Sequence, residues 1–253
     1  MQNVIEKLKE IDSSDVGIII YSSEKRKKVT EYNSNLLVPL ASAAKVAVGF
    51  CITKWVEEKL LNWNDIVEDI CFNPKEDSKE LYPHFQHRKT LLLQDAVEIM
   101  IACHDSFVAD RIVQMCGGWE EVNKKVKSYF LNINITQNPR DKENNGYLSE
   151  MFELMLLVYY GYQANPELWA PIIKGLVRQK GDIDGIPTHL LNHMSGGLDN
   201  VVVEIGILGD LNHNPFLYVL GANNLPKRNV NLFSDQKIMD AIRLLYEEYL
   251  DEK

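Results

Sequence analysis

The stretch LVPLASAAKVAVGFC, residues 37–51, places one serine and one lysine within an otherwise apolar segment. The residues that follow Ser42 are apolar at nearly every position, which predicts a helix that is buried on all sides. Lys45 lies three residues after Ser42, so both side chains project from the same face of that helix. Two interpretations stay open at this point: a capping serine with a lysine that reaches solvent, or a nucleophile and its base.

The spacing Ser-x-x-Lys is a weak signal by itself, because the chain also has it at Ser22 and at Ser234. Those two serines fall in a predicted turn and at the start of a predicted surface helix, where capping is a sufficient explanation. Ser42 instead opens a buried helix, whose first turn offers unpaired N–H groups and a partial positive charge. Burial also lowers the pKa of a lysine, which makes Lys45 a usable base.

Composition limits the classes of protein to which the chain can belong. Its 253 residues, 45% of them hydrophobic, suffice for one large domain or two closely packed lobes. The net charge of −9 argues against a partner that is a nucleic acid or an anionic membrane. No segment approaches the ~20 apolar residues of a membrane span. The N-terminus lacks the apolar core of a secretory signal, so we expect a cytoplasmic protein; a secreted protein trimmed before Met1 is the alternative.

The order of the predicted elements indicates one mixed lobe with a helical insertion. An N-terminal helix, a β-hairpin over residues 15–33 and a closing helix over residues 234–250 bracket a long helical block. We expect residues 1–41 and 190–253 to form an α/β (α+β) lobe and residues 42–189 an inserted all-α lobe. Gly161 is predicted to end a helix, and Ser234 to cap the last one.

Two further motifs carry polar side chains of catalytic types. His104, Asp105 and Ser106 stand between two predicted helices, where Asp105 or Ser106 would serve equally well as a helix cap. The run His193-Met194-Ser195-Gly196-Gly197 leads toward a predicted strand, and taken alone it indicates a glycine turn.

Together the three motifs, in this order and spacing, resemble those of the penicillin-recognising serine hydrolases, most closely the class A β-lactamases. VPLASAAKVAVGF is similar to the nucleophile helix of that family. KTLLLQDAVEIMIACHDSFVADRIVQMCGGWEEVN follows the region of its second motif. The resemblance runs from the N-terminal to the C-terminal helix, and it implies an antiparallel sheet flanked by helices with an inserted all-α lobe.

The resemblance implies a role for each matching residue. Ser42 would be the acylated nucleophile, and Lys45 its base or proton relay. The oxyanion hole would use the backbone N–H groups of Ser42 and Gly197. Asp105 matches the structural aspartate of the second motif. The implied chemistry is acyl transfer from a small ester, amide or β-lactam, with no cofactor and no metal.

The chain departs from the family pattern at the wall that would bind substrate. His104 replaces a serine that passes a proton to the leaving nitrogen, a role that imidazole can also perform. Ser106 replaces an asparagine that holds the substrate amide. Met194-Ser195-Gly196 keeps the hydroxyl and the glycine of the third motif but lacks its lysine. The loss of one charged contact is worth about 1.5–3 kcal/mol, so we expect weakened hydrolysis of anionic β-lactams.

The loop at residues 139–146 is another departure, because the family glutamate that activates the deacylating water has no clear counterpart there. Asp141 and Glu143 are the available carboxylates in this loop. Without such a base an acyl-enzyme would turn over slowly. The alternative function is therefore a non-catalytic or slowly deacylating penicillin-binding or sensor protein on the same fold. His84–His87 and His189–His193 have spacings seen in metal sites, but no ligand cluster accompanies them.

Overall fold

A five-stranded antiparallel sheet forms one half of the molecule. The computed structural model describes residues 1–11 and 15–252. The strand order is β2-β1-β9-β8-β7, so the strand with the third motif lies at an edge. The strands of this sheet are β1 (Asp15–Ser22), β2 (Lys27–Tyr32), β7 (Leu191–Leu198), β8 (Val201–Leu208) and β9 (Phe216–Asn223). Two short pairs complete the strands: β3 (Leu37–Pro39) with β6 (Asn145–Tyr147), and β4 (Ile66–Val67) with β5 (Leu91–Leu92).

Helices occupy both faces of this sheet. The α-helices are α1 (Gln2–Lys9), α2 (Ala44–Glu57), α3 (Ser78–Leu81), α4 (Leu93–Ala102), α5 (Ser106–Met115), α6 (Trp119–Lys127), α7 (Leu148–Ala164), α8 (Pro166–Arg178) and α9 (Phe233–Asp251). The 3₁₀ turns η1 (Ala41–Ala43), η2 (Pro83–Phe85) and η3 (Thr188–Leu190) lie between helices and strands. Within the described residues, no helix is both long enough and apolar enough to cross a membrane.

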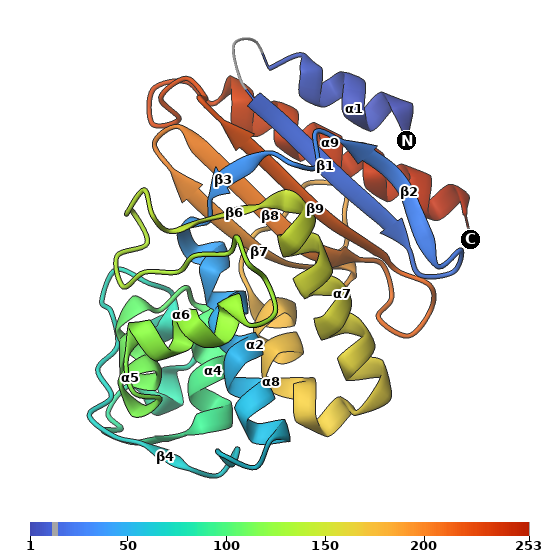
Figure 1. Ribbon diagram of the computed structural model, residues 1–253. Coiled ribbons are helices and arrows are strands. Elements are labelled where there is room, and N and C mark those ends of the chain that lie inside the picture. Colours follow the sequence, from blue (N-terminus) through green and yellow to red (C-terminus); the bar gives the residue numbers. More distant parts are fainter. Residues whose placement is uncertain (12–14, 253) are drawn as a thin grey trace.

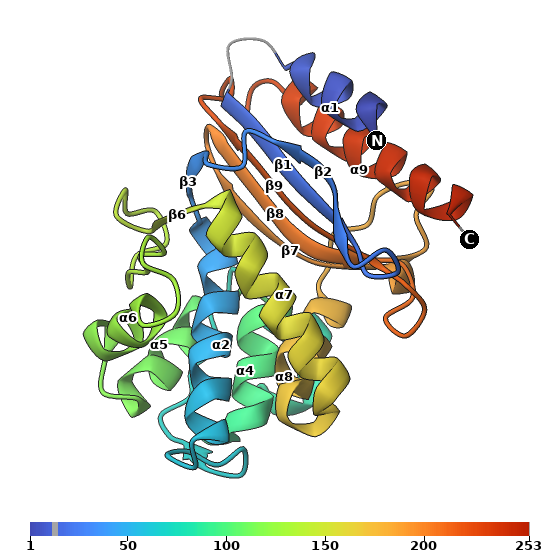
Figure 2. The same cartoon turned by 45° about the vertical axis from the view of Figure 1, so that its right-hand side comes forward.

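The two faces of the sheet bury separate cores because side chains alternate along each strand. Ile18 and Ile20 of β1 belong to the core under α1 and α9, whereas Ile19 belongs to the core shared with the helical block. Figures 1 and 2 show α1 and α9 side by side on the outer face, with α2, α4, α7 and α8 on the other side of the sheet. The expected α/β fold with an antiparallel sheet and a helical block is thus confirmed. The division at residues 41/42 and 189/190 stays a prediction.

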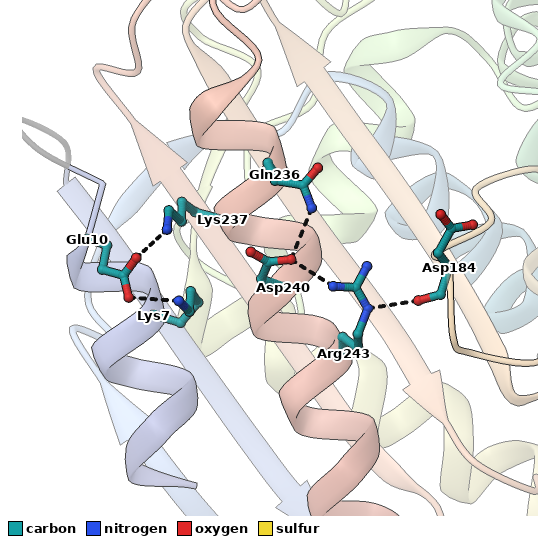
Figure 3. A network of polar contacts seen from close by, with 7 residues as sticks. All are labelled: Lys7, Glu10, Asp184, Gln236, Lys237, Asp240 and Arg243. Atoms are coloured by element: carbon teal, nitrogen blue, oxygen red, sulfur yellow. Dashed lines mark hydrogen bonds and ion pairs between the residues drawn. The ribbon is translucent and has the colours of Figure 1, made fainter.

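Polar contacts connect α1, α9 and the loop that follows α8 on the outer face of the sheet (Figure 3). Glu10, the residue that follows α1, accepts hydrogen bonds from Lys7 of α1 and from Lys237 of α9. Arg243 of α9 donates from Nε to the backbone carbonyl of Asp184, at 2.8 Å. The loop that follows α8 is therefore attached to α9, and the same loop passes the candidate site described below.

Two predicted helix boundaries are wrong, and packing explains the first. Gly161 does not end a helix but lies inside α7. A Cβ at Gly161 would stand 2.4 Å from the Trp169 indole, so the glycine is there to admit that ring. Ser234 is not the cap of α9, which begins one residue earlier at Phe233. Phe233 N–H donates instead to the side chain of Asn231, at 2.9 Å.

The close approach of α7 and Trp169 makes a testable prediction about Gly161. Alanine is normally about 1 kcal/mol better than glycine inside a helix. We expect Gly161→Ala to lower the free energy of unfolding by about 1–3 kcal/mol, because its methyl group overlaps the indole. Denaturant unfolding measures the change. In a Trp169→Phe background the same substitution should be nearly neutral, and an equal loss in both backgrounds would contradict the packing argument.

Candidate active site

Ser42 lies in the tight turn between β3 and α2. The predicted helix begins slightly later than expected, at Ala44, and Ser42 occupies the 3₁₀ turn before it. Lys45 Nζ donates to Ser42 Oγ at 3.3 Å, and Ser42 is half-buried. The residue before the serine, Ala41, has φ of +46°, a conformation rare outside glycine that costs of order 1–3 kcal/mol. The strained residue Ala41 therefore directly precedes the candidate nucleophile Ser42.

Lys45 is buried to a degree unusual for a lysine, with only 6% of its surface exposed. Burial lowers the pKa of its ammonium group from 10.5 to about 8, while the carboxylates of Glu76 and Asp105 act in the opposite direction. With a pKa near 8, about a tenth of the amine is neutral at pH 7, a far larger fraction than for an ordinary lysine. Lys45 can therefore accept a proton from a group within hydrogen-bond distance.

His104 lies in the turn between α4 and α5, with φ of +55°. Its Nε2 contacts the side-chain amide of Gln179, the first residue after α8. Burial, and then the positive charge of Lys45, lower the pKa of His104 to about 4. The imidazole is therefore neutral at pH 7, and it lies near enough to Lys45 for the two charges to interact.

Asp105 and Ser106 start helix α5. Asp105 is fully buried and caps the helix, its Oδ1 accepting hydrogen bonds from the N–H groups of Phe107 (3.0 Å) and Val108 (3.1 Å). Its Oδ2 accepts from the N–H of Asn73 at 3.1 Å, and the side chain of Asn73 donates to Ser106 Oγ at the same distance. Burial raises the pKa of Asp105 although these hydrogen bonds oppose the shift. Sequence reasoning missed Asn73, which stands in an irregular segment with no motif.

The residues of the third motif divide between the two faces of β7. Met194 is fully buried in the core shared with the helical block, so its side chain does not line an open wall. Gly196 lies on the same face, and a Cβ there would be 2.5 Å from the carbonyl oxygen of Leu40. Ser195 points to the α9 face, where its Oγ donates to Glu204 Oε1. Gly197 is exposed and lies beside Arg228.

The two candidate carboxylates of the 139–146 loop are both exposed. Asp141 Oδ1 accepts a hydrogen bond from the N–H of Glu143 at 3.0 Å, a contact typical of a polar turn. Asp141 lines a groove of about 770 Å³ next to α5, together with Ser106. Neither carboxylate lines the smaller cavity beside Lys45.

That smaller cavity, of about 20 Å³, adjoins Lys45, Ser106 and Asn144. Its volume is sufficient for one water molecule. Asn144 is fully buried, and its Nδ2 donates to the carbonyl of Ala41 at 3.2 Å. Its Oδ1 is buried with no hydrogen-bond partner among the described residues. No sequence signal marks Asn144, because it is one polar residue in a wholly polar loop.

Arg228 is a second residue that the sequence did not single out. A Cβ on Gly197 would be 2.5 Å from its Nη1, so the guanidinium stands directly beside the proposed oxyanion residue. Its Nε donates to Asp235 at 2.6 Å, and its Nη1 to the carbonyls of Leu198 and Val201. A cation is therefore present beside Gly197, on the α9 side of the sheet and not in the core that contains Met194.

The histidine pairs do not form metal sites of the usual composition. His189 is exposed, whereas His193 is buried and its Nδ1 is 2.9 Å from Glu204 Oε2. In residues 1–11 and 15–252, no three His, Cys, Asp or Glu side chains gather as a metal ion would require.

Comparison with protein families identifies the chain. The model of the beta-lactamase enzyme family matches residues 1–247. The chain belongs to the beta-lactamase enzyme family. The resemblance inferred from the three motifs is thereby confirmed at the level of the family. No curated protein sequence matches the chain significantly.

Solved structures of other beta-lactamase-like proteins have the same fold. A mutant of PBP-A, in an acyl-enzyme complex with penicillin G, matches with a TM-score of 0.81 and 16% identity, over 99% of this chain and 96% of that chain. A beta-lactamase from Chitinophaga pinensis matches with a TM-score of 0.79 and 16% identity, over 98% of both chains. A variant of the class A beta-lactamase of the last common ancestor of Gram-negative bacteria matches with a TM-score of 0.76 and 14% identity, over 100% of this chain and 98% of that chain.

The burial of Lys45 makes a testable prediction about stability. The pKa of Lys45 is about 8 in the folded protein, and its ordinary value, which applies to the unfolded chain, is 10.5. Between pH 8 and 10.5 the unfolded chain therefore binds more protons than the folded protein. Stability of the wild type should therefore rise from pH 8 to 10.5, relative to Lys45→Met, by about 3 kcal/mol. Denaturant unfolding across this pH range measures the difference. Lys124→Met, which removes a surface lysine, controls for the charge; the same slope in both variants would contradict burial as the cause.

Proposed function

We propose that the protein is a serine hydrolase of the beta-lactamase type that forms an acyl-enzyme on Ser42 from an ester or amide. The hydrogen bond of 3.3 Å between Lys45 Nζ and Ser42 Oγ, with Lys45 buried and its pKa near 8, is the observation that carries the proposal. A serine hydroxyl is a weak nucleophile until an adjacent base takes its proton. Lys45 is such a base, held in place by its own helix.

In the proposed acylation, Ser42 Oγ attacks the carbonyl carbon of the substrate while its proton passes to the neutral amine of Lys45. The carbonyl oxygen becomes an oxyanion that accepts hydrogen bonds from the N–H groups of Ser42 and Gly197. Collapse of the tetrahedral intermediate breaks the bond to the leaving alcohol or amine. That leaving group takes up the proton that Ser42 released, and the acyl group remains on Ser42.

His104 is the proposed route for that proton. Its pKa of about 4 means that the resting imidazole is neutral and holds no proton in excess. It can act as an acid toward the leaving group only after it receives a proton, for which the ammonium of Lys45 is the available source. The contact with Gln179 holds the ring in one orientation during this transfer.

Deacylation is the slower half of the proposed cycle. The cavity of about 20 Å³ next to Lys45 and Asn144 can accommodate the attacking water, with the unpartnered Oδ1 of Asn144 as an acceptor. Asp141 and Glu143 are exposed and do not line this cavity, so neither is placed to deprotonate that water. This observation favours the second candidate function, a penicillin-binding or sensor-type protein that stays acylated.

We propose that the substrate is a small-molecule ester or amide, and that activity on anionic β-lactams is weak. Met194 supplies no charge, and Arg228, the cation beside Gly197, is already paired with Asp235 at 2.6 Å. PBP-A, a similar protein, forms an acyl-enzyme with penicillin G in a mutant. Acylation by a β-lactam is therefore included in the test below.

The proposal predicts acylation that depends on Ser42. Wild-type protein incubated with penicillin G, a fluorophosphonate or p-nitrophenyl acetate should gain the mass of the acyl or phosphonyl group with at least one reagent, by intact-protein mass spectrometry. Ser42→Ala should abolish the adduct, and Ser128→Ala, which changes a surface serine, should keep it. Lys45→Met should slow labelling by about 10²–10⁴-fold, as expected for loss of a general base.

The pH dependence and the fate of the adduct complete the test. Labelling should accelerate as the pH rises and level off above about 8, where Lys45 is neutral. An adduct that decays supports a hydrolase, whereas a persistent one supports the sensor. No adduct with any reagent, or labelling that survives in Ser42→Ala, would contradict both candidate functions.

A further inference from the structure

A second cavity lies against the other face of β7. Its volume is about 360 Å³, and it is a partly open pocket lined by residues of β7, β8, α9 and the loop that follows α8. Ser195 and Glu204 line it, and none of its residues is shared with the small cavity beside Lys45. The third motif therefore presents its hydroxyl to this cavity rather than to the core.

Glu204 brings a buried carboxylate to the wall of this cavity. Only 7% of its surface is exposed, and it lies directly opposite Ser195 in the β7–β8 pair. Its Oε1 accepts from Ser195 Oγ at 2.5 Å, and its Oε2 is 2.9 Å from His193 Nδ1. His193 is itself 3% exposed, and a Cβ on Gly181 would be 2.5 Å from its other ring nitrogen. A buried carboxylate is costly unless it meets hydrogen-bond donors or a cation.

The lysine and the arginine that line the cavity both pair with other carboxylates, so neither of them neutralises Glu204. Arg228 lines the cavity but is paired with Asp235. Lys180 also lines it, and its ammonium contacts two carboxylates at the surface near α3. Asp182, the remaining carboxylate of the lining, is exposed to solvent. Apart from His193, three carboxylates and two cations line the cavity, which gives its wall an excess of negative charge.

The cavity lies within reach of a substrate bound at Ser42. Ser195 precedes Gly196, whose backbone packs on Leu40 and Ala43 on either side of Ser42. Ser195 is two residues from Gly197 on the strand, a distance of about 7 Å. A group about five bonds from the reacting carbonyl spans that distance. β7 is an edge strand of the sheet, and such a substrate can lie along it.

We propose that Glu204, with Ser195 and His193, is a subsite for a positively charged group of the acyl substrate, an ammonium or a guanidinium. The cation forms charge-assisted hydrogen bonds with the carboxylate, which are about twice as strong as those of a neutral donor. The substrate class is thus a cationic acyl ester or amide rather than an anionic β-lactam. The assignment of the subsite to the acyl substrate rests on the proposed acylation of Ser42.

Matched esters test the specificity. The probes are p-nitrophenyl 4-guanidinobutanoate and its uncharged isostere, p-nitrophenyl 6-methylheptanoate. Wild type should be acylated by the cationic ester about tenfold to a hundredfold faster. Glu204→Gln should remove this preference and leave the rate with the neutral ester unchanged. Asp182→Asn, which removes an exposed carboxylate from the same cavity, should keep it.

The neutral ester also reports whether Glu204→Gln is folded and competent. An equal loss of rate with both esters would make Glu204 a structural residue and overturn the proposal. Ser195→Ala, which leaves the charge in place, should keep most of the preference. Faster acylation of wild type by the neutral ester would overturn the proposal as well.

Binding without chemistry separates this proposal from the proposed function. Calorimetric titration of Ser42→Ala with butylguanidinium should show binding, and the double variant Ser42→Ala/Glu204→Gln should lose it. Pentanol, an uncharged control, should bind to neither variant. If wild type is acylated by neither ester but binds butylguanidinium through Glu204, acylation fails and the cation subsite stands. If acylation proceeds without preference and butylguanidinium binding does not depend on Glu204, the subsite is refuted and acylation stands.

Discussion

The contact between strand β7 and the turn before α2 is the constraint on which the site depends. Gly196 allows it, because any side chain there would collide with the carbonyl of Leu40 and crowd Ala43. The contact places the strand that carries Gly197 against the turn that carries Ser42. The same turn contains the strained backbone of Ala41, whose carbonyl accepts a hydrogen bond from the buried side-chain amide of Asn144. The serine is thereby fixed between two rigid elements.

Charged groups are buried both in the helical block and on the α9 face of the sheet. Lys45, Asp105 and Glu204 each lie within a largely apolar surrounding, and each carries hydrogen bonds that partly offset the loss of water. The shift of the Lys45 pKa corresponds to about 3 kcal/mol that the fold supplies at neutral pH. Two apolar cores, one on each face of the sheet, provide that stability.

The sequence predicted local features well, because they depend on spacing along one element. The proximity of Ser42 and Lys45, for example, follows from helical spacing. The sequence could not predict features that depend on contacts between segments far apart along the chain. Glu204 meets Ser195 only through the register of β7 and β8. Gly161 was misread for the same reason, since its partner Trp169 lies on the next helix.

The same limit applies to Asn144 and Arg228, which no spacing distinguishes from ordinary loop residues. Asn144 gains its importance from being buried next to Ala41, and Arg228 from lying beside Gly197. Family resemblance supplies roles only for positions that match a motif, and these two residues match none. Their place in the site follows from the packing of the loops onto the nucleophile turn.

The central claim is that the fold holds a buried, readily deprotonated lysine against Ser42. The most direct measurement is an NMR pH titration of protein labelled with ¹³C at lysine Cε, with the Lys45 signal assigned by its absence in Lys45→Met. The account predicts a titration midpoint of about 8 for this signal. A midpoint near the ordinary value of 10.5 would contradict the claim.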